Sequence, residues 1–156
     1  MGINLVSNKL IEGVIISPLS QIKDARGAVM HHINYKSPNY KGFEEVYISK
    51  TLPNVVKAWK LHKRMTQNFC VPVGSFKIAI FDNRNESETF GCVNEYLIDE
   101  DEFYSLLTIP PGVYYGFKCL SQYPGVIVNL TNLLFDSSEV VRLDIQNEII
   151  PYNWDQ

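Results

Sequence analysis

The chain has 156 residues, of which 46% are hydrophobic and 20% charged, so one domain with an ordinary core fits and a disordered chain is excluded. The 14 Lys and Arg against 17 Asp and Glu give a net charge of −3, which disfavours nucleic acid or an anionic membrane as a partner. No apolar run approaches the roughly 18 residues of a membrane helix, and the N-terminus lacks the apolar segment of a signal peptide. We therefore expect a cytoplasmic protein.

Short segments with strand character follow one another along the chain, and no segment keeps a helical period beyond about two turns. They span residues 27–35, 43–48, 55–61, 68–73, 75–81, 92–98, 105–109, 113–120 and 126–132. Clusters of Gly, Pro, Asn and Asp separate them, and Gly74 predicts a tight bend between two of the strands. The pattern predicts an all-β, antiparallel sandwich or barrel, with residues 1–156 forming a single domain.

The cysteines and histidines do not suggest a metal or redox site. The three cysteines are widely spaced in apolar surroundings, which is typical of buried small hydrophobic residues. His31 and His32 are adjacent in a predicted strand and point to opposite faces, so only one of them could join His62 inside a barrel. Two histidines do not complete a metal site, and we expect neither a metal nor an organic cofactor.

A basic cluster surrounds His62, because Lys57, Lys60, Lys63 and Arg64 fall within eight consecutive residues. Two interpretations stay open on this pattern alone. One is a solvated basic strand edge with a hydrogen-bonded histidine. The other is an anion site, such as a diphosphate site, beside an imidazole whose ordinary pKa suits proton transfer near neutral pH.

Several short motifs occur in a defined order along the chain. The segments that carry them are Ile11-Glu12-Gly13-Val14, Asp24-Ala25-Arg26-Gly27, Leu61-His62, Asp82-Asn83-Arg84, Ser87-Glu88-Thr89-Phe90-Gly91, Pro110-Pro111-Gly112, Tyr115-Gly116-Phe117, Thr131-Asn132 and Tyr152-Asn153-Trp154. In order and spacing they resemble the dTDP-4-dehydrorhamnose 3,5-epimerase family of cupin-type nucleotide-sugar epimerases, in which residues 11–14 would form the opening strand. The resemblance covers nearly the whole chain.

The resemblance implies a cupin-type antiparallel jelly-roll barrel that forms a homodimer. It further implies an isomerase that acts on a nucleotide-linked 4-keto-6-deoxy sugar, for polysaccharide or other deoxysugar biosynthesis. In such enzymes a His removes a proton from the carbon beside the ketone, and a Tyr returns it on the other face. By position, His62 matches that base and Arg26 matches an arginine of the nucleotide-binding surface.

Several positions differ from the family pattern. Val128 holds the place of the family Tyr, and Gln67 holds that of a lysine near the enolate oxygen. Trp59 replaces an arginine before the base, and Tyr115 replaces a histidine. In the family, the carboxylate that orients the base comes from a C-terminal extension. Because this chain ends at Gln156, we expect that carboxylate to be missing.

A second resemblance leaves the reaction open. Residues 60–68 and 74–78 are also similar to the nucleotide-sugar 3,4-ketoisomerases, although Lys60 stands where those enzymes have the first of two histidines. A third interpretation is a non-catalytic nucleotide-sugar-binding protein with the same barrel. The Pro-Pro-Gly and Thr-Phe-Gly motifs favour the epimerase.

Strand alternation supplies candidates for the family groups that this chain lacks. Residues 29 and 31 share a strand face, so His31 is predicted to point into the barrel, where it would be a further proton donor. We predict His62, Tyr47 and Tyr115 as catalytic residues. The predicted substrate-binding residues are Arg26, His31, Lys60, Arg64, Gln67 and Asn129.

Overall fold

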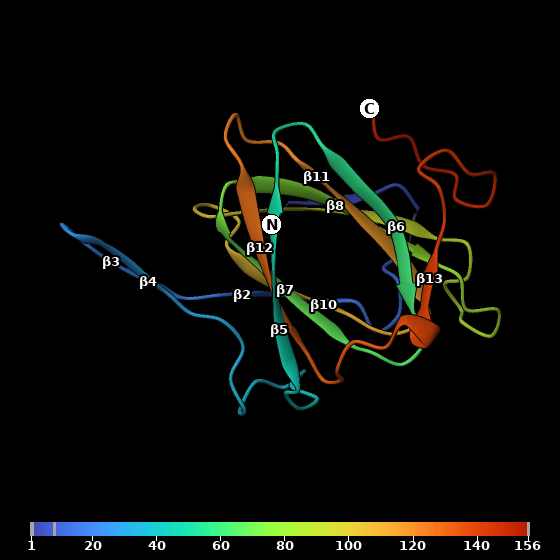
Figure 1. Ribbon diagram of the computed structural model, residues 1–156, viewed down its shortest axis with the longest axis horizontal. Helices are drawn as coiled ribbons and strands as arrows, with labels where there is room; N and C mark the ends of the chain where they lie inside the picture. The colour runs from blue at the N-terminus through green and yellow to red at the C-terminus, as the bar shows by residue number, and fades with distance from the viewer. Residues whose placement is uncertain (1, 8, 156) are drawn as a thin grey trace.

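The computed structural model describes residues 2–7 and 9–155, which form two antiparallel sheets and a separate hairpin (Figure 1). The six-stranded sheet runs in the order β1-β9-β8-β11-β6-β13. Its strands are β1 (Gly2–Leu5), β9 (Val93–Asp99), β8 (Ser75–Asp82), β11 (Val113–Cys119), β6 (Val56–His62) and β13 (Val140–Arg142).

The five-stranded sheet runs in the order β2-β10-β7-β12-β5. Its strands are β2 (Ile15–Pro18), β10 (Ser105–Ile109), β7 (Gln67–Val73), β12 (Gly125–Thr131) and β5 (Glu45–Thr51). The hairpin of β3 (Gln21–Asp24) and β4 (Gly27–Met30) projects from the barrel, and a 3-10 turn, η1 (Ser137–Glu139), precedes β13 (Figure 1). Within the described ranges, no helix is long and apolar enough to cross a membrane.

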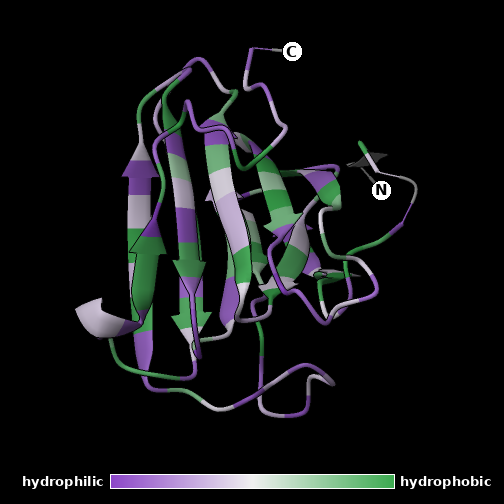
Figure 2. Cartoon of the chain, turned by 90° about the vertical axis from the view of Figure 1, so that its right-hand side faces the viewer, coloured by the Kyte–Doolittle hydropathy of each residue, from purple (hydrophilic) through white to green (hydrophobic). Residues whose placement is uncertain are grey.

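The core lies between the two sheets because alternate strand residues face each other across it. On β12, buried residues alternate with half-buried ones along the whole strand. Bands of apolar and polar residues alternate along the strands in Figure 2. The largest buried cluster includes Phe76, Ile78 and Ile80 of β8 with Leu107 and Ile109 of β10, so the middle strands of both sheets meet at its centre.

A second apolar cluster covers the other face of the six-stranded sheet. Trp59 of β6 packs against Tyr152 and Trp154 of the C-terminal segment, with ring centroids 5.8 and 5.1 Å apart. The Tyr152 hydroxyl donates a hydrogen bond to the Glu95 carboxylate at 2.6 Å. The Tyr152-Asn153-Trp154 motif therefore serves as a packing motif that closes the outside of this sheet.

The predicted all-β antiparallel class is confirmed, and the eight strands predicted after residue 42 correspond to β5 through β12. Gly74 forms the bend between β7 and β8 with a φ of 85°, as predicted.

Two predictions near the N-terminus are wrong. The strand predicted at 27–35 ends at Met30, because its partner β3 is only four residues long. Residues 11–14 form a turn at Gly13, where φ is 80°, instead of an opening strand. The sequence also fails to predict β1, β2, β3 and β13, since each has only three or four residues and shows no clear period.

A β-bulge in β6 decides which of its side chains face the barrel interior. Tyr115 of β11 pairs with Lys60, whereas Phe117, two residues later, pairs with Lys57, three residues earlier on β6. Lys57 and Lys60 therefore share the inward face with Tyr115 and Phe117. Strict alternation would have turned one of the two lysines outward.

Gly116 of β11 lies opposite the bulge, and its lack of a side chain leaves the space that the bulge occupies. A Cβ at Gly116 would lie 3.0 Å from Ala58 Cα, closer still to Ala58 Cβ, and 2.8 Å from a ring carbon of Trp154. Any larger residue would push β6 and the C-terminal segment away from β11. The glycine of the Tyr-Gly-Phe motif is thus required by the packing between strands.

Replacement of Gly116 by Ala is expected to lower the free energy of unfolding by about 1–3 kcal/mol, because the new methyl group overlaps Ala58 and Trp154. Urea denaturation measures the change. Ala58→Gly should recover part of this loss in the Gly116→Ala protein, although it is destabilising by itself. Full stability of Gly116→Ala, or strictly additive losses in the double variant, would contradict the proposed contact.

Candidate active site

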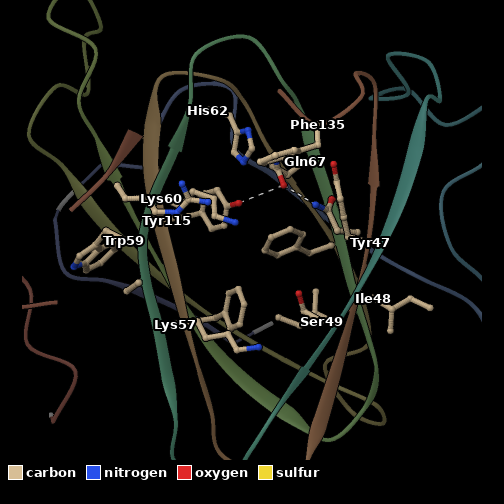
Figure 3. Close-up of a pocket in the computed structure, with 16 residues that line it drawn as sticks. Tyr47, Ile48, Ser49, Lys57, Trp59, Lys60, His62, Gln67, Tyr115 and Phe135 are labelled. Carbon is tan, nitrogen blue, oxygen red and sulfur yellow. Dashed lines mark hydrogen bonds between the residues drawn. The ribbon is translucent and has the colours of Figure 1, made fainter. Parts of the chain in front are cut away.

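A cavity of about 510 Å³ lies between the sheets, with walls from β5, β6, β7, β11, β12 and β13 (Figure 3). Six of the predicted site residues line it, namely Tyr47, Lys60, His62, Gln67, Tyr115 and Asn129. Among residues 2–7 and 9–155, no three His, Cys, Asp or Glu side chains gather as a potential metal site.

His62 is the last residue of β6, and a carboxylate holds its imidazole. Nδ1 of His62 lies 2.5 Å from Oε1 of Glu139, and the two side chains are only 6% and 3% exposed. The expectation that the chain lacks an orienting carboxylate is therefore wrong. Glu139, the last residue of η1, supplies it from a segment well before the C-terminus.

The second oxygen of the Glu139 carboxylate is fixed as well. Oε2 accepts hydrogen bonds from the backbone N–H groups of Arg64 at 2.9 Å and Met65 at 3.3 Å. Burial acts to raise the pKa of Glu139, but the hydrogen bonds from His62 and these backbone donors outweigh it and hold the pKa below its ordinary value. The carboxylate is therefore ionised at neutral pH and can only accept hydrogen bonds.

An ionised acceptor fixes the tautomer of His62. Nδ1 carries the hydrogen that it donates to Glu139, which leaves Nε2 free to accept a proton. Burial lowers the pKa of His62, and the Glu139 carboxylate offsets only part of that effect. The imidazole is thus neutral near pH 7, which is the state in which a histidine acts as a general base.

Gln67 and Asn129 form an amide pair beside His62. Asn129 Nδ2 donates a hydrogen bond to Gln67 Oε1 at 2.5 Å, and the Tyr115 hydroxyl lies 3.4 Å from the same oxygen. The Tyr115 ring is nearly parallel to the His62 imidazole, with centroids 6.2 Å apart. Burial raises the pKa of Tyr115, so its hydroxyl stays protonated. His62, Gln67 and Tyr115 lie near one another in Figure 3, and the hydrogen bond to Gln67 joins Asn129 to this group.

Tyr47 enters the cavity from β5, on the wall opposite β6 (Figure 3). Its hydroxyl donates a 2.7 Å hydrogen bond to Oε2 of Glu45, which also accepts from the backbone N–H of Phe135. Burial and the Glu45 carboxylate raise the pKa of Tyr47, so its hydroxyl keeps its proton at neutral pH. A proton donor thus lies across the cavity from a proton acceptor.

Lys57, Lys60 and Arg142 form a basic wall along β6 and β13. Arg142 pairs with Lys60 across the two strands, and all three residues line the cavity. Burial, helped by the charges of Arg142 and Lys57, lowers the pKa of Lys60. In the part of the chain that the structure describes, no carboxylate lies within ion-pair distance of these three side chains. The basic wall therefore presents positive charge without an anionic partner.

Three predicted substrate-binding residues do not line the cavity of the single chain. Arg26 lies at the tip of the β3–β4 hairpin, exposed, with its guanidinium 2.7 Å from the Asp24 carboxylate. His31 is also exposed, so the prediction that it points into the barrel is wrong: the hairpin projects from the barrel and does not line it. Arg64 follows β6, is 65% exposed, and lies 3.4 Å from Asp136.

Val128, at the position expected to carry a tyrosine, also lies outside the cavity lining. Its neighbours Ile127 and Asn129 line the cavity, because alternate residues of β12 face inward. Position 128 therefore contributes no side chain to the cavity lining.

Sequence reasoning misses Glu139 and Arg142. The segment Asp136-Ser137-Ser138-Glu139 matches a helix-capping pattern, and Asp136 does cap η1 by accepting from the Ser138 backbone N–H. That signal could have indicated the turn. It could not have indicated the partner of Glu139, which lies 77 residues away.

Comparisons with known proteins find relatives over nearly the full chain. The model of the dTDP-4-dehydrorhamnose 3,5-epimerase family matches residues 8–156. A crystal structure of a dTDP sugar isomerase from Desulfovibrio desulfuricans G20 is 37% identical, with a TM-score of 0.90 over 93% of this chain and 92% of that chain. The spore coat polysaccharide biosynthesis protein SpsL of Bacillus subtilis strain 168 is 29% identical over 147 residues, which are 93% of this chain and 97% of that protein.

More distant structures share the fold. The epimerase RmlC from Legionella pneumophila Philadelphia 1, in complex with dTDP-4-keto-L-rhamnose, is 17% identical, with a TM-score of 0.83 over 97% of this chain and 83% of that chain. These neighbours confirm the predicted cupin-type antiparallel jelly-roll barrel.

Replacement of Glu139 by Gln is expected to lower the pKa of His62 further, because the Glu139 charge is the influence that raises that pKa against burial. The pKa can be followed by NMR titration of the imidazole, with His62→Gln to assign the signal. Asp136→Asn is the matched control, since it removes an exposed carboxylate from the same turn. An unchanged or higher pKa in Glu139→Gln would contradict the assigned pair.

Proposed function

Because this chain belongs to the dTDP-4-dehydrorhamnose 3,5-epimerase family, an isomerase family, we propose that it epimerises a nucleotide-linked 4-keto-6-deoxy sugar beside the ketone. The observation that carries the proposal is the buried His62–Glu139 pair, which presents a neutral base to the cavity. A hydrogen on a carbon next to a ketone can be removed by such a base, since the resulting negative charge moves to the oxygen. The reaction needs neither a metal nor an organic cofactor.

In this proposal Nε2 of His62 removes the proton. General-base catalysis of this kind contributes about 10²–10⁴-fold to the rate. Glu139 holds the ring in the reactive tautomer and stabilises the imidazolium that forms. His62 is therefore the catalytic base, and Glu139 is a positioning residue.

Tyr47 returns a proton from the opposite side of the sugar. It is protonated, it lines the cavity, and it lies on the wall that faces His62. Return of the proton from the other face inverts the carbon, whereas return from His62 restores the starting sugar. Tyr115 is the second candidate donor, although its hydroxyl lies on the His62 side and faces Gln67.

The basic wall of Lys57, Lys60 and Arg142 binds the diphosphate. Cations without anionic partners in a partly buried cavity favour a ligand with negative charge. The Legionella relative binds dTDP-4-keto-L-rhamnose, which supports a dTDP-linked substrate for this chain. The relation to SpsL supports a role in polysaccharide biosynthesis.

We further propose that the protein forms a homodimer, in which the β3–β4 hairpin of each subunit contacts the other subunit. Ile22 and Val29 face each other across the hairpin and are 62% and 63% exposed. On β5, Ile48 is 71% exposed. Neighbouring apolar side chains exposed on one face, such as this hairpin pair, favour an interface. Substrate binding by Arg26 and His31 then requires that the hairpin of one copy reach the cavity of the other.

Incubation with a dTDP-linked 4-keto-6-deoxy sugar in D2O is expected to place deuterium on the carbon beside the ketone, as NMR would show. His62→Asn should slow this exchange by about 10²–10⁴-fold, because it removes the base and keeps the side-chain shape. Tyr47→Phe should keep exchange and lose inversion, since the deuteron then returns only from the His62 side.

Lys63→Gln is the matched control, because Lys63 belongs to the same basic segment but is exposed outside the cavity. Migration of the ketone during exchange would identify a 3,4-ketoisomerase. Tight binding of the nucleotide sugar without exchange would identify a binding protein. Absence of any binding would overturn the nucleotide-sugar proposal.

Light scattering is expected to give twice the mass of the 17.9 kDa chain. Ile22→Asp combined with Val29→Asp should yield a monomer, because both changes place charge on the exposed apolar side of the hairpin. Ile149→Asp, at an exposed apolar residue of the C-terminal segment, should leave the mass unchanged. A monomeric native chain, or a hairpin variant that stays dimeric, would contradict this contact.

A further inference from the structure

We propose that Glu45 is a positioning residue for the proton donor: its carboxylate holds the hydroxyl of Tyr47 in place, and inversion of the sugar depends on that contact. This inference rests on the proposed function, because it takes Tyr47 as the donor that acts from the side opposite His62. Glu45 itself does not line the cavity, so it acts through Tyr47 and not on the substrate.

The spacing along β5 brings the carboxylate to the hydroxyl. Glu45 and Tyr47 are two residues apart on this strand, so their side chains project from the same face. Both are half-buried, whereas Val46 and Ile48 on the other face are 44% and 71% exposed. The Tyr47 hydroxyl donates a 2.7 Å hydrogen bond to Oε2 of Glu45. The contact therefore runs along the strand, beside the cavity.

The backbone of Glu45 is anchored where β5 begins. Glu45 pairs with Thr131 at the end of β12, and the Thr131 hydroxyl donates to the Glu45 carbonyl oxygen at 3.2 Å. The backbone N–H of Glu44 donates in turn to the Thr131 carbonyl oxygen at 2.9 Å. Because β5 is the last strand of the five-stranded sheet, these contacts fix its end. A carboxylate on an anchored backbone can hold a hydroxyl at one place.

The same carboxylate oxygen also holds the segment that follows β12. Oε2 of Glu45 accepts a 3.0 Å hydrogen bond from the backbone N–H of Phe135, and the Phe135 side chain lines the cavity. One oxygen atom thus joins two residues of the cavity lining that lie 88 positions apart in the sequence. Figure 3 shows Tyr47 across the cavity from Lys60 and Tyr115. Loss of the carboxylate would release the donor from this wall.

The proton transfer balances with water as the only further reactant. A hydroxyl rotates about its C–O bond, so Glu45 fixes the oxygen of Tyr47 while its hydrogen can turn to the sugar. Tyr47 gives this proton to the carbon, the electrons of the enolate C=C bond form the new C–H bond, and the carbonyl is restored. The phenolate then takes a proton from water, and the His62 imidazolium releases one to water. Burial and the Glu45 carboxylate raise the pKa of Tyr47, which favours its return to the protonated form.

Glu45→Ala is expected to lower the ratio of inversion to deuterium exchange about 10–10²-fold, because a displaced donor is costly whereas His62 still removes the proton. A dTDP-linked 4-keto-6-deoxy sugar in D2O gives both quantities by NMR in one sample. Exchange is followed from the loss of the C–H signal, and inversion from the configuration of the product. A merely structural role of Glu45 would lower exchange and inversion together.

Glu45→Gln should restore a ratio close to the native one, because both hydrogen bonds go to a single oxygen and an amide oxygen can accept two. Glu44→Ala is the matched control, since Glu44 is the neighbouring carboxylate and is exposed. In the Tyr47→Phe protein, Glu45→Ala should change neither exchange nor inversion any further, because its effect passes through Tyr47.

A second measurement does not depend on the folding of Glu45→Ala. The pKa of Tyr47 should be lower in Glu45→Gln than in the native chain, because the variant removes a charge that raises it. The phenolate absorbance of each protein, minus that of its Tyr47→Phe counterpart, reports this pKa. A native ratio in Glu45→Ala, an equal loss of exchange and inversion, or an unchanged pKa in Glu45→Gln would overturn the role of Glu45. If the native chain does not exchange, or Tyr47→Phe still inverts the sugar, the proposed function fails instead.

Discussion

The carboxylate of Glu139 is the interaction on which the geometry of the cavity depends. One oxygen holds the imidazole of His62, and the other accepts the backbone N–H groups of Arg64 and Met65. The same residue accepts the Lys63 N–H on its backbone oxygen. A single side chain thus joins the end of β6, the turn to β7 and the start of β13. Because it is ionised and buried, replacing it would leave several donors unpaired at once.

The β6 bulge positions the second part of the cavity. It turns Lys57 and Lys60 toward the interior together, and it can form only because Gly116 leaves room between β6 and β11. Trp154 covers Gly116 from the outside, so the C-terminal segment takes part in holding the bulge. The packing of the outer face and the charge of the cavity therefore depend on the same few contacts. The Tyr152-Asn153-Trp154 motif, which does not line the cavity, thus supports the cavity through packing.

Local patterns in the sequence predict the long strands, because β5 through β12 each have five to eight residues and are bounded by turn signals. They also single out His62, a lone histidine in a basic strand end. They fail for His31, since the face that a strand residue presents matters only if the strand belongs to the barrel. They fail for Glu139 as well, because its contact joins positions far apart in the chain. Alternation likewise cannot predict that Lys57 and Lys60 face the same way, since the bulge depends on the neighbouring strand.

In the proposed function, the distribution of charge in the cavity places the diphosphate of the substrate on the basic wall. Two carboxylates that contact residues of the cavity lining, those of Glu139 and Glu45, are hydrogen-bonded to His62 and Tyr47. The basic wall has no such partner, so the free positive charge lies along β6 and β13. A diphosphate placed at the amide end would lie beside the Glu139 carboxylate, and in a partly buried site that repulsion is weakly screened. The basic wall also reaches His62, because Lys60 and Arg142 help to lower the pKa of its imidazole. In the proposed function, the charges that bind the diphosphate therefore also favour the neutral imidazole, which is the state that a general base needs.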